Sequence, residues 1–222
     1  MSEELPFEFE RKFFVRKVPD EALKHGAAQT IVQAYVFAQA GYAIRVRIAF
    51  PGPCTSLPRY DERVDHMGGY ERRVLGLLLD RAQETPHTDG QDGEENGAQA
   101  TITVKSPSVS GERYELETPL DFDVAVQIIQ HSAHLIVKQR YSLWIGEDGW
   151  EFDVFAGQNQ GLAVAECERM GPVTDLRIPD FCVTEVTDDV RFTNDRLARE
   201  PWSQWDTQFY AQLSACGPYF EK

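Results

Sequence analysis

Apolar and polar residues alternate with a period of two along much of this chain, which is the pattern of β-strands with one buried face. The first case is the segment 6–15, where Phe7, Phe9 and Phe13 alternate with charged residues. Similar alternation, or a run of β-branched and aromatic residues, predicts further strands at 29–37, 42–50, 100–106, 112–118, 135–145, 150–155 and 162–169.

Helical spacing of apolar residues separates some of these strands and dominates the end of the chain. A short helix is predicted at 19–24, and a longer one at 121–134 with Asp121 as its cap. The C-terminal portion is predicted to be helical at 190–199 and 201–215. About eight strands in successive antiparallel hairpins, with these helices, predict an α+β fold built on a closed barrel or a sandwich.

One region, at about 51–99, does not belong to this pattern and is predicted to be an insertion in a single domain that spans residues 1–222. It contains a charged helix at 69–83, followed by a polar, acidic and glycine-rich stretch at 84–98 that is predicted to be partly disordered. The insertion could cap one end of the barrel or contact a partner, but a tolerated surface loop is the favoured interpretation.

Charged residues recur two apart on one predicted strand after another, and residues two apart share a face. The opposite faces are apolar and would need helices to cover them. A solvated outer face explains any one strand, but the whole set favours a closed eight-stranded antiparallel barrel with charge inside and helices outside. That interior would hold the bases Lys12, Arg45, Arg47, Lys105, Arg113, Lys138 and Arg140 and the acids Glu8, Glu10, Glu115, Glu117, Asp153, Glu166 and Glu168.

So many buried charges are costly unless they are paired or bound to ions. A polyanion would suit the bases and divalent cations would suit the carboxylates, whose oxygen ligands favour Mg²⁺ or Mn²⁺ over zinc. The formal net charge of −14, from 36 acidic and 22 basic residues, disfavours binding of nucleic acid or anionic membranes. Four scattered cysteines and no apolar stretch of membrane-spanning length lead us to expect a cytoplasmic protein.

The motif Glu8-x-Glu10-x-Lys12 resembles the signature of the CYTH, or triphosphate tunnel metalloenzyme, superfamily, in its bacterial short form. Further similar segments follow in the family's order: Gln33-Ala34-Tyr35-Val36, Arg45-x-Arg47, Thr103-x-Lys105, Arg113-x-Glu115-x-Glu117, Lys138-x-Arg140, Asp153-x-Phe155, Glu166-x-Glu168 and 185–194. The resemblance covers the chain apart from the insertion.

This resemblance implies an eight-stranded tunnel that acts on triphosphates with Mg²⁺ or Mn²⁺. It implies metal ligation by Glu8, Glu10 and Glu168, joined by Asp153 and Glu166 for a second metal or the attacking water. The implied catalytic residues are Lys12, Glu117, Asp153 and Glu166, and the implied phosphate-binding residues are Lys12, Arg45, Arg47, Lys105, Arg113, Lys138 and Arg140.

The expected reaction is hydrolysis of the terminal phosphate of an inorganic or organic triphosphate, with tripolyphosphate favoured. Class IV-type adenylyl cyclase and thiamine triphosphatase remain alternatives within the same family. A non-catalytic polyphosphate- or nucleotide-binding protein is an alternative of a different class. The expected partner is a small triphosphate, and the apolar outer surfaces could support a homodimer.

Overall fold

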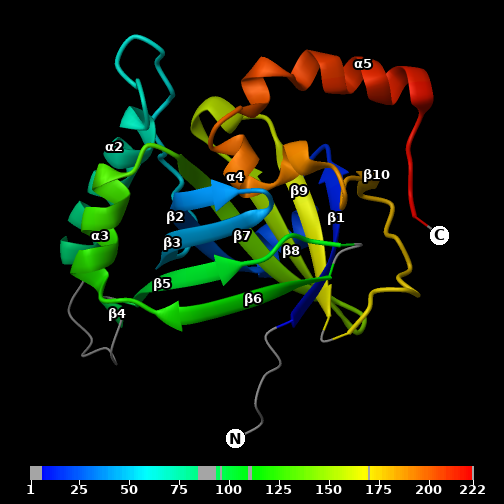
Figure 1. The fold of residues 1–222 in the computed structure, drawn as a ribbon, viewed down its shortest axis with the longest axis horizontal. Helices are drawn as coiled ribbons and strands as arrows, with labels where there is room; N and C mark the ends of the chain where they lie inside the picture. Colours follow the sequence, from blue (N-terminus) through cyan, green and yellow to red (C-terminus); the bar gives the residue numbers. More distant parts are fainter. Residues whose placement is uncertain (1–6, 85–93, 96, 110–111, 170, 222) are drawn as a thin grey trace, which may run out of the picture.

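The computed structural model describes residues 7–84, 94–95, 97–109, 112–169 and 171–221. Its strands form a closed antiparallel barrel with helices outside (Figure 1), which confirms the predicted barrel over the sandwich. The ring runs in the order β1-β6-β5-β3-β2-β7-β8-β9, and pairing of β9 with β1 closes it. Its members are β1 (Phe7–Val15), β2 (Ala27–Gln39), β3 (Tyr42–Pro51), β5 (Ala98–Lys105), β6 (Glu112–Pro119), β7 (Leu135–Ile145), β8 (Asp148–Phe155) and β9 (Ala163–Arg169).

Two of the ten strands lie outside this ring. β4 (Glu94–Glu95) pairs with β5, inside the stretch predicted to be partly disordered; residues 85–93 and 96 of that stretch lie outside the described residues. β10 (Cys182–Glu185) pairs with the second half of β1, whose first half pairs with β6 on the same edge. The sequence pattern missed β10 because four residues are too few to show an alternation.

The insertion is part of the hydrophobic core, so the interpretation of a tolerated surface loop is wrong for its helix. α2 (Gly69–Glu84) lies beside α3 (Phe122–His131) on the outer face of the barrel (Figure 1). Val74 and Leu75 of α2 are buried with Ile129 of α3 against the apolar faces of β2, β3, β5 and β7. Asp121 caps α3 as predicted, since its side chain accepts a hydrogen bond from the Val124 amide.

The C-terminal portion is less helical than predicted. The segment 190–199 contains a 3₁₀ turn, η2 (Val190–Phe192), and a single turn of helix, α4 (Asn194–Leu197), separated by Thr193 in an extended conformation. A second 3₁₀ turn, η3 (Trp202–Gln204), precedes α5 (Asp206–Cys216). The other short elements are α1 (Asp20–His25) and η1 (Gly157–Asn159).

Apolar side chains fill one end of the barrel interior. Phe14 and Ile136 continue the inner faces that carry Lys12 and Lys138, and both are completely or almost completely buried. They pack with Trp202 and Phe209 from the C-terminal segment, with 5.0 Å between the ring centroids of Phe14 and Phe209. The polar part of the interior therefore lies beyond this apolar layer.

Arg11 faces outward, as its place in the alternation predicts, but it is buried. Its guanidinium donates to both carboxylate oxygens of Glu185 on β10, at 2.9 and 2.5 Å. The Glu185 carboxylate also accepts from the Glu221 amide near the end of the chain. Among the described residues, no helix is long and apolar enough to cross a membrane.

Candidate active site

The inner faces of the strands line a cavity of about 1580 Å³ that contains most of the predicted site residues. Its wall includes Glu8, Lys12, Arg45, Arg47, Lys105, Arg113, Glu115, Glu117, Arg140, Glu151, Glu166 and Glu168. Each reaches the cavity because alternate residues of a strand point to the same face. The structure thus brings together charges from strands that are far apart in the sequence.

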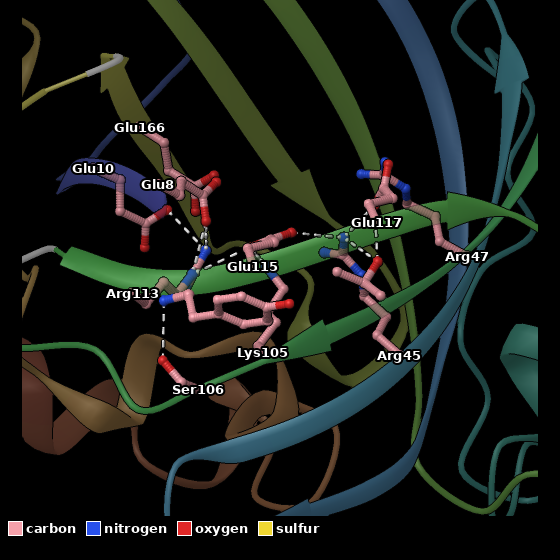
Figure 2. Close-up of polar contacts among 12 residues, drawn as sticks. Glu8, Glu10, Arg45, Arg47, Lys105, Ser106, Arg113, Glu115, Glu117 and Glu166 are labelled. Atoms are coloured by element: carbon pink, nitrogen blue, oxygen red, sulfur yellow. Dashed lines mark hydrogen bonds and ion pairs between the residues drawn. The ribbon is translucent and has the colours of Figure 1, made fainter. Parts of the chain in front are cut away.

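One wall of the cavity carries four bases that share two glutamates of β6. Glu117 lies between Arg45 and Arg47, with nitrogen–oxygen distances of 2.9 and 2.6 Å (Figure 2). Glu115 forms ion pairs with Lys105, with Arg113 at 3.2 Å and with Arg45 at 3.4 Å. These bases are therefore already oriented toward oxygen anions by the protein itself.

A second cluster, from β7, β8 and β9, is more deeply buried. Asp153 is completely buried and forms ion pairs with Lys138 and Arg140. Arg140 also reaches Glu166 at 3.0 Å, and Glu166 reaches Lys12 of β1 at 3.0 Å. Although burial opposes ionisation, Lys12 and Arg140 hold the pKa of Glu166 well below its usual range.

Two overlapping groups of carboxylates could hold metal ions. Glu8, Glu10 and Glu168 each place one oxygen within 4.8 Å of the others, and so do Glu151, Glu166 and Glu168. Glu168 is common to both groups, and no ion pair or hydrogen bond links it to a cation among the described residues. Burial and the nearby carboxylates of Glu151, Glu8 and Glu166 raise the pKa of Glu168 to about 9.

This donor set fits a hard divalent cation. Its ligands would all be carboxylate oxygens, as Mg²⁺ and Mn²⁺ prefer. A cation would also remove the repulsion that keeps Glu168 protonated near neutral pH.

Two of the predicted catalytic carboxylates, Asp153 and Glu117, contact bases of the cavity. Asp153 contacts bases and belongs to neither carboxylate group, and its place there is taken by Glu151. Glu117 contacts Arg45 and Arg47. The sequence reasoning did not assign Glu151 to the site, although its spacing from Asp153 on the same strand could have done so.

Burial and neighbouring cations also tune the lysines of the cavity. Burial, with Arg45 and Arg113 nearby, lowers the pKa of Lys105 to about 8. Burial and Arg140 lower the pKa of Lys138 to about 8. For Lys12, the carboxylates of Glu10 and Glu166 outweigh burial and raise the pKa.

Three buried polar atoms on the inner face have no hydrogen-bond partner among the described residues. They are Oε1 of Gln33, Nε of Arg45 and Oγ1 of Thr101. Buried polar groups are rarely left unpaired, and where they are, a functional reason is often found. Of these three residues, Arg45 is among those that line the cavity.

No protein-family model matches the chain. An inorganic triphosphatase from Acetivibrio thermocellus is 32% identical over 106 residues, which cover 47% of this chain and 68% of that protein. The crystal structure of an inorganic triphosphatase is 22% identical, covers 86% of this chain and 93% of its own, and has a TM-score of 0.48. A conserved hypothetical protein from Pyrococcus furiosus is 14% identical, covers 75% and 80%, and has a TM-score of 0.43.

The matches with the solved structures are too distant to support an argument. The Acetivibrio protein is similar enough to show the family. This match is 32% identical and spans 68% of the Acetivibrio protein. The closed eight-stranded barrel and the order of charged motifs along its strands are consistent with it. The chain belongs to the CYTH, or triphosphate tunnel metalloenzyme, superfamily.

Proposed function

We propose that this protein is a metal-dependent triphosphatase that cleaves the terminal phosphate of an inorganic triphosphate, tripolyphosphate, inside its barrel. The observation that carries the proposal is the arrangement of charge in one cavity. A wall of bases on β3, β5 and β6 faces carboxylate groups on β1, β8 and β9. A triphosphate chelated to a cation would satisfy both halves. The name of the Acetivibrio relative supports a small inorganic substrate.

In this proposal the bases hold the phosphate oxygens and the carboxylates hold the cation. Glu8, Glu10 and Glu168 would ligate Mg²⁺ or Mn²⁺, with Glu151 and Glu166 able to ligate a second ion. When bound, the cation neutralises charge on the phosphates and favours in-line displacement. The phosphate-binding residues are Arg45, Arg47, Lys105, Arg113, Lys138 and Arg140, with Lys12 beside them.

The glutamates paired with the bases would position them rather than touch the reacting atoms. Glu117 orients Arg45 and Arg47, and Asp153 orients Lys138 and Arg140. Such pre-orientation matters because phosphoryl transfer depends mainly on positioning and charge neutralisation.

Glu166 would orient the attacking water, either directly or as a ligand of the second ion. It lines the cavity, and its depressed pKa keeps it ionised as a hydrogen-bond acceptor. Attack by the oriented water on the terminal phosphorus breaks the bond to the bridging oxygen. The products are orthophosphate and diphosphate.

The experiment is to measure phosphate release from tripolyphosphate, ATP and thiamine triphosphate, with Mg²⁺, with Mn²⁺ and with chelator. We expect metal-dependent release from tripolyphosphate, with loss of at least 100-fold in kcat in Glu10→Gln, on the order of other lost electrostatic contacts in active sites. Glu21→Gln, which changes an exposed glutamate of α1, is the matched control.

Four results would count against the proposal. Full activity of Glu10→Gln would remove the metal-binding assignment. Release from thiamine triphosphate alone, or formation of cyclic AMP from ATP, would replace the substrate. Binding of tripolyphosphate without release under any metal condition would make the protein a sensor instead of an enzyme.

A further inference from the structure

The outer face of the barrel is covered along only part of β3, β5 and β6. Val46 of β3 and Ala100 of β5 are buried, because they pack with α2 and α3. Toward the turn between β5 and β6, Val104 is 42% exposed, and Leu116 of β6 is 49% exposed. Figure 1 shows α2 and α3 at the other end of β5 and β6. The outward side chains beyond these helices are therefore left half exposed.

The exposed apolar side chains form a continuous row across four strands. Phe37 of β2 is the cross-strand partner of Ile44 of β3. Ile44 is in turn the partner of Val104, and Val104 is the partner of Leu116. Cross-strand partners have Cβ atoms about 4.5–5.5 Å apart, so the four side chains contact one another in sequence along the row. None of these four residues lines the cavity, so the row is separate from the candidate active site.

The row and the outward positions beside it are uncharged, although the protein has a formal net charge of −14. The neighbouring outward residues are Tyr42, Val46, Ile102, Ser106, Tyr114 and Thr118. Glu112 is the next outward residue of β6 beyond Tyr114, whereas Lys105 and Glu115 point into the barrel. Such a face offers apolar contact without groups that would attract a charged partner. Two acidic copies can approach there with little local repulsion.

The area of the row suits the apolar core of a small dimer interface. Aromatic side chains bury about 150–250 Å² each, so Phe37, at 44% exposure, presents roughly 65–110 Å². With Tyr42, which is 55% exposed, and with Val104 and Leu116, the total is about 300–500 Å². A standard interface buries about 800 Å² per partner, of which about 65% is apolar in homodimers. The row therefore provides most of such a core, and the dimer should be weak and dependent on concentration.

We propose that this row is the interface of a homodimer, in which a second copy of the chain packs its own row against it across a two-fold axis. A sheet with an apolar face is stabilised when another layer covers that face. A second copy supplies a layer of the same size and the same apolar character. Two-fold dimers, in which one patch contacts itself, are the commonest soluble homo-oligomers. Two sheets packed in this way lie about 10 Å apart with their apolar side chains interdigitated.

The test is sedimentation velocity of wild type and its variants over a concentration series, at low and at high NaCl. Leu116→Glu places a charge in the row of each copy and should raise the Kd of the dimer about 100-fold or more. Leu23→Glu is the matched control, because Leu23 of α1 is 50% exposed and lies outside the row. Salt should strengthen the wild-type dimer, because it screens the repulsion between two acidic copies.

A second variant, Val104→Thr, keeps the test decisive if Leu116→Glu does not fold. Thr keeps the β-branched shape of Val but buries a hydroxyl in each copy of the dimer, so the Kd should rise about 10-fold. The proposal is overturned if wild type stays monomeric at every concentration, or if both row variants dimerise like wild type. It is also overturned if Leu23→Glu loses the dimer as fully as Leu116→Glu. A wild-type dimer that salt weakens would be held by ion pairs on a different face, which would overturn the proposal too.

Discussion

Removing one partner of the buried ion pair between Arg11 and Glu185 should strongly destabilise the protein, because the other charge would stay buried where the end of the chain packs on the barrel. The Glu185 side chain is 2% exposed and the Arg11 side chain 11%. The carboxylate accepts four hydrogen bonds, two from Arg11, one from Oγ1 of Thr187 and one from the amide of Glu221. The Glu185→Ala variant would leave the Arg11 guanidinium buried without its anion.

The expected cost follows from what remains around Arg11. Removing one partner of a buried ion pair typically costs about 3–5 kcal/mol. Arg11 would retain a hydrogen bond to the carbonyl of Glu221 at 3.1 Å, so the lower end, about 3 kcal/mol, applies. In a domain of this size 1 kcal/mol shifts Tm by about 2–4 °C, so Tm should fall by about 6–12 °C.

The assay is unfolding in urea and by heat. It compares wild type, Glu185→Ala and a double variant that combines Arg11→Met with Glu185→Leu. Apolar replacement of both partners leaves no buried charge, so the double variant should be more stable than Glu185→Ala. A fall in Tm of less than 2 °C for Glu185→Ala, or a double variant that is less stable than it, would refute the reasoning.

The pH dependence provides an independent check on the same pair. Although burial opposes ionisation, Arg11 and the other donors hold the pKa of Glu185 below its ordinary value of 4.5. A depressed pKa adds stability above 4.5 that is lost as the pH falls through the lower, folded-state value. The difference between wild type and Glu185→Ala should therefore shrink below about pH 4.5, and a constant difference down to pH 2 would contradict the assignment.

Two further predictions concern the cavity and the insertion. Because the pKa of Lys105 is lowered to about 8, its charge is present below that pH and lost above it, so KM for tripolyphosphate should rise above pH 8. Lys105→Arg should show a smaller rise, the remainder coming from Lys138, whose pKa is also lowered to about 8, and identical pH profiles would contradict this. Leu75 of α2 is 1% exposed, so Leu75→Ala should lower the free energy of unfolding, measured in urea, by about 2–5 kcal/mol. Asp80 on the same helix is exposed, so Asp80→Ala should change the free energy of unfolding by less than about 0.5 kcal/mol. Equal effects of the two variants would show that α2 is not part of the core.

Most of the barrel was predictable because strand faces are decided locally. The alternation in 6–15 already places Glu8, Glu10 and Lys12 on one face, since successive side chains of a strand point in opposite directions whatever the strand pairs with. The same reasoning brought the bases of four other strands to the interior. Helices were harder to predict where the chain turns sharply, as at Thr193, because tertiary packing around Trp202 decides the conformation there.

What the sequence alone determined was which side chains face the interior; which charges meet there was decided by the tertiary structure. Glu166 and Glu168 lie on the same face of β9, yet Glu166 is paired with Lys12 and Arg140, while Glu168 forms no ion pair among the described residues and lies near the carboxylates of Glu151, Glu8 and Glu166. That difference depends on the register between β1 and β9, where Glu10 pairs with Glu168 and Lys12 with Glu166. Registers between strands more than 150 positions apart arise from closure of the whole barrel, and no local pattern contains them.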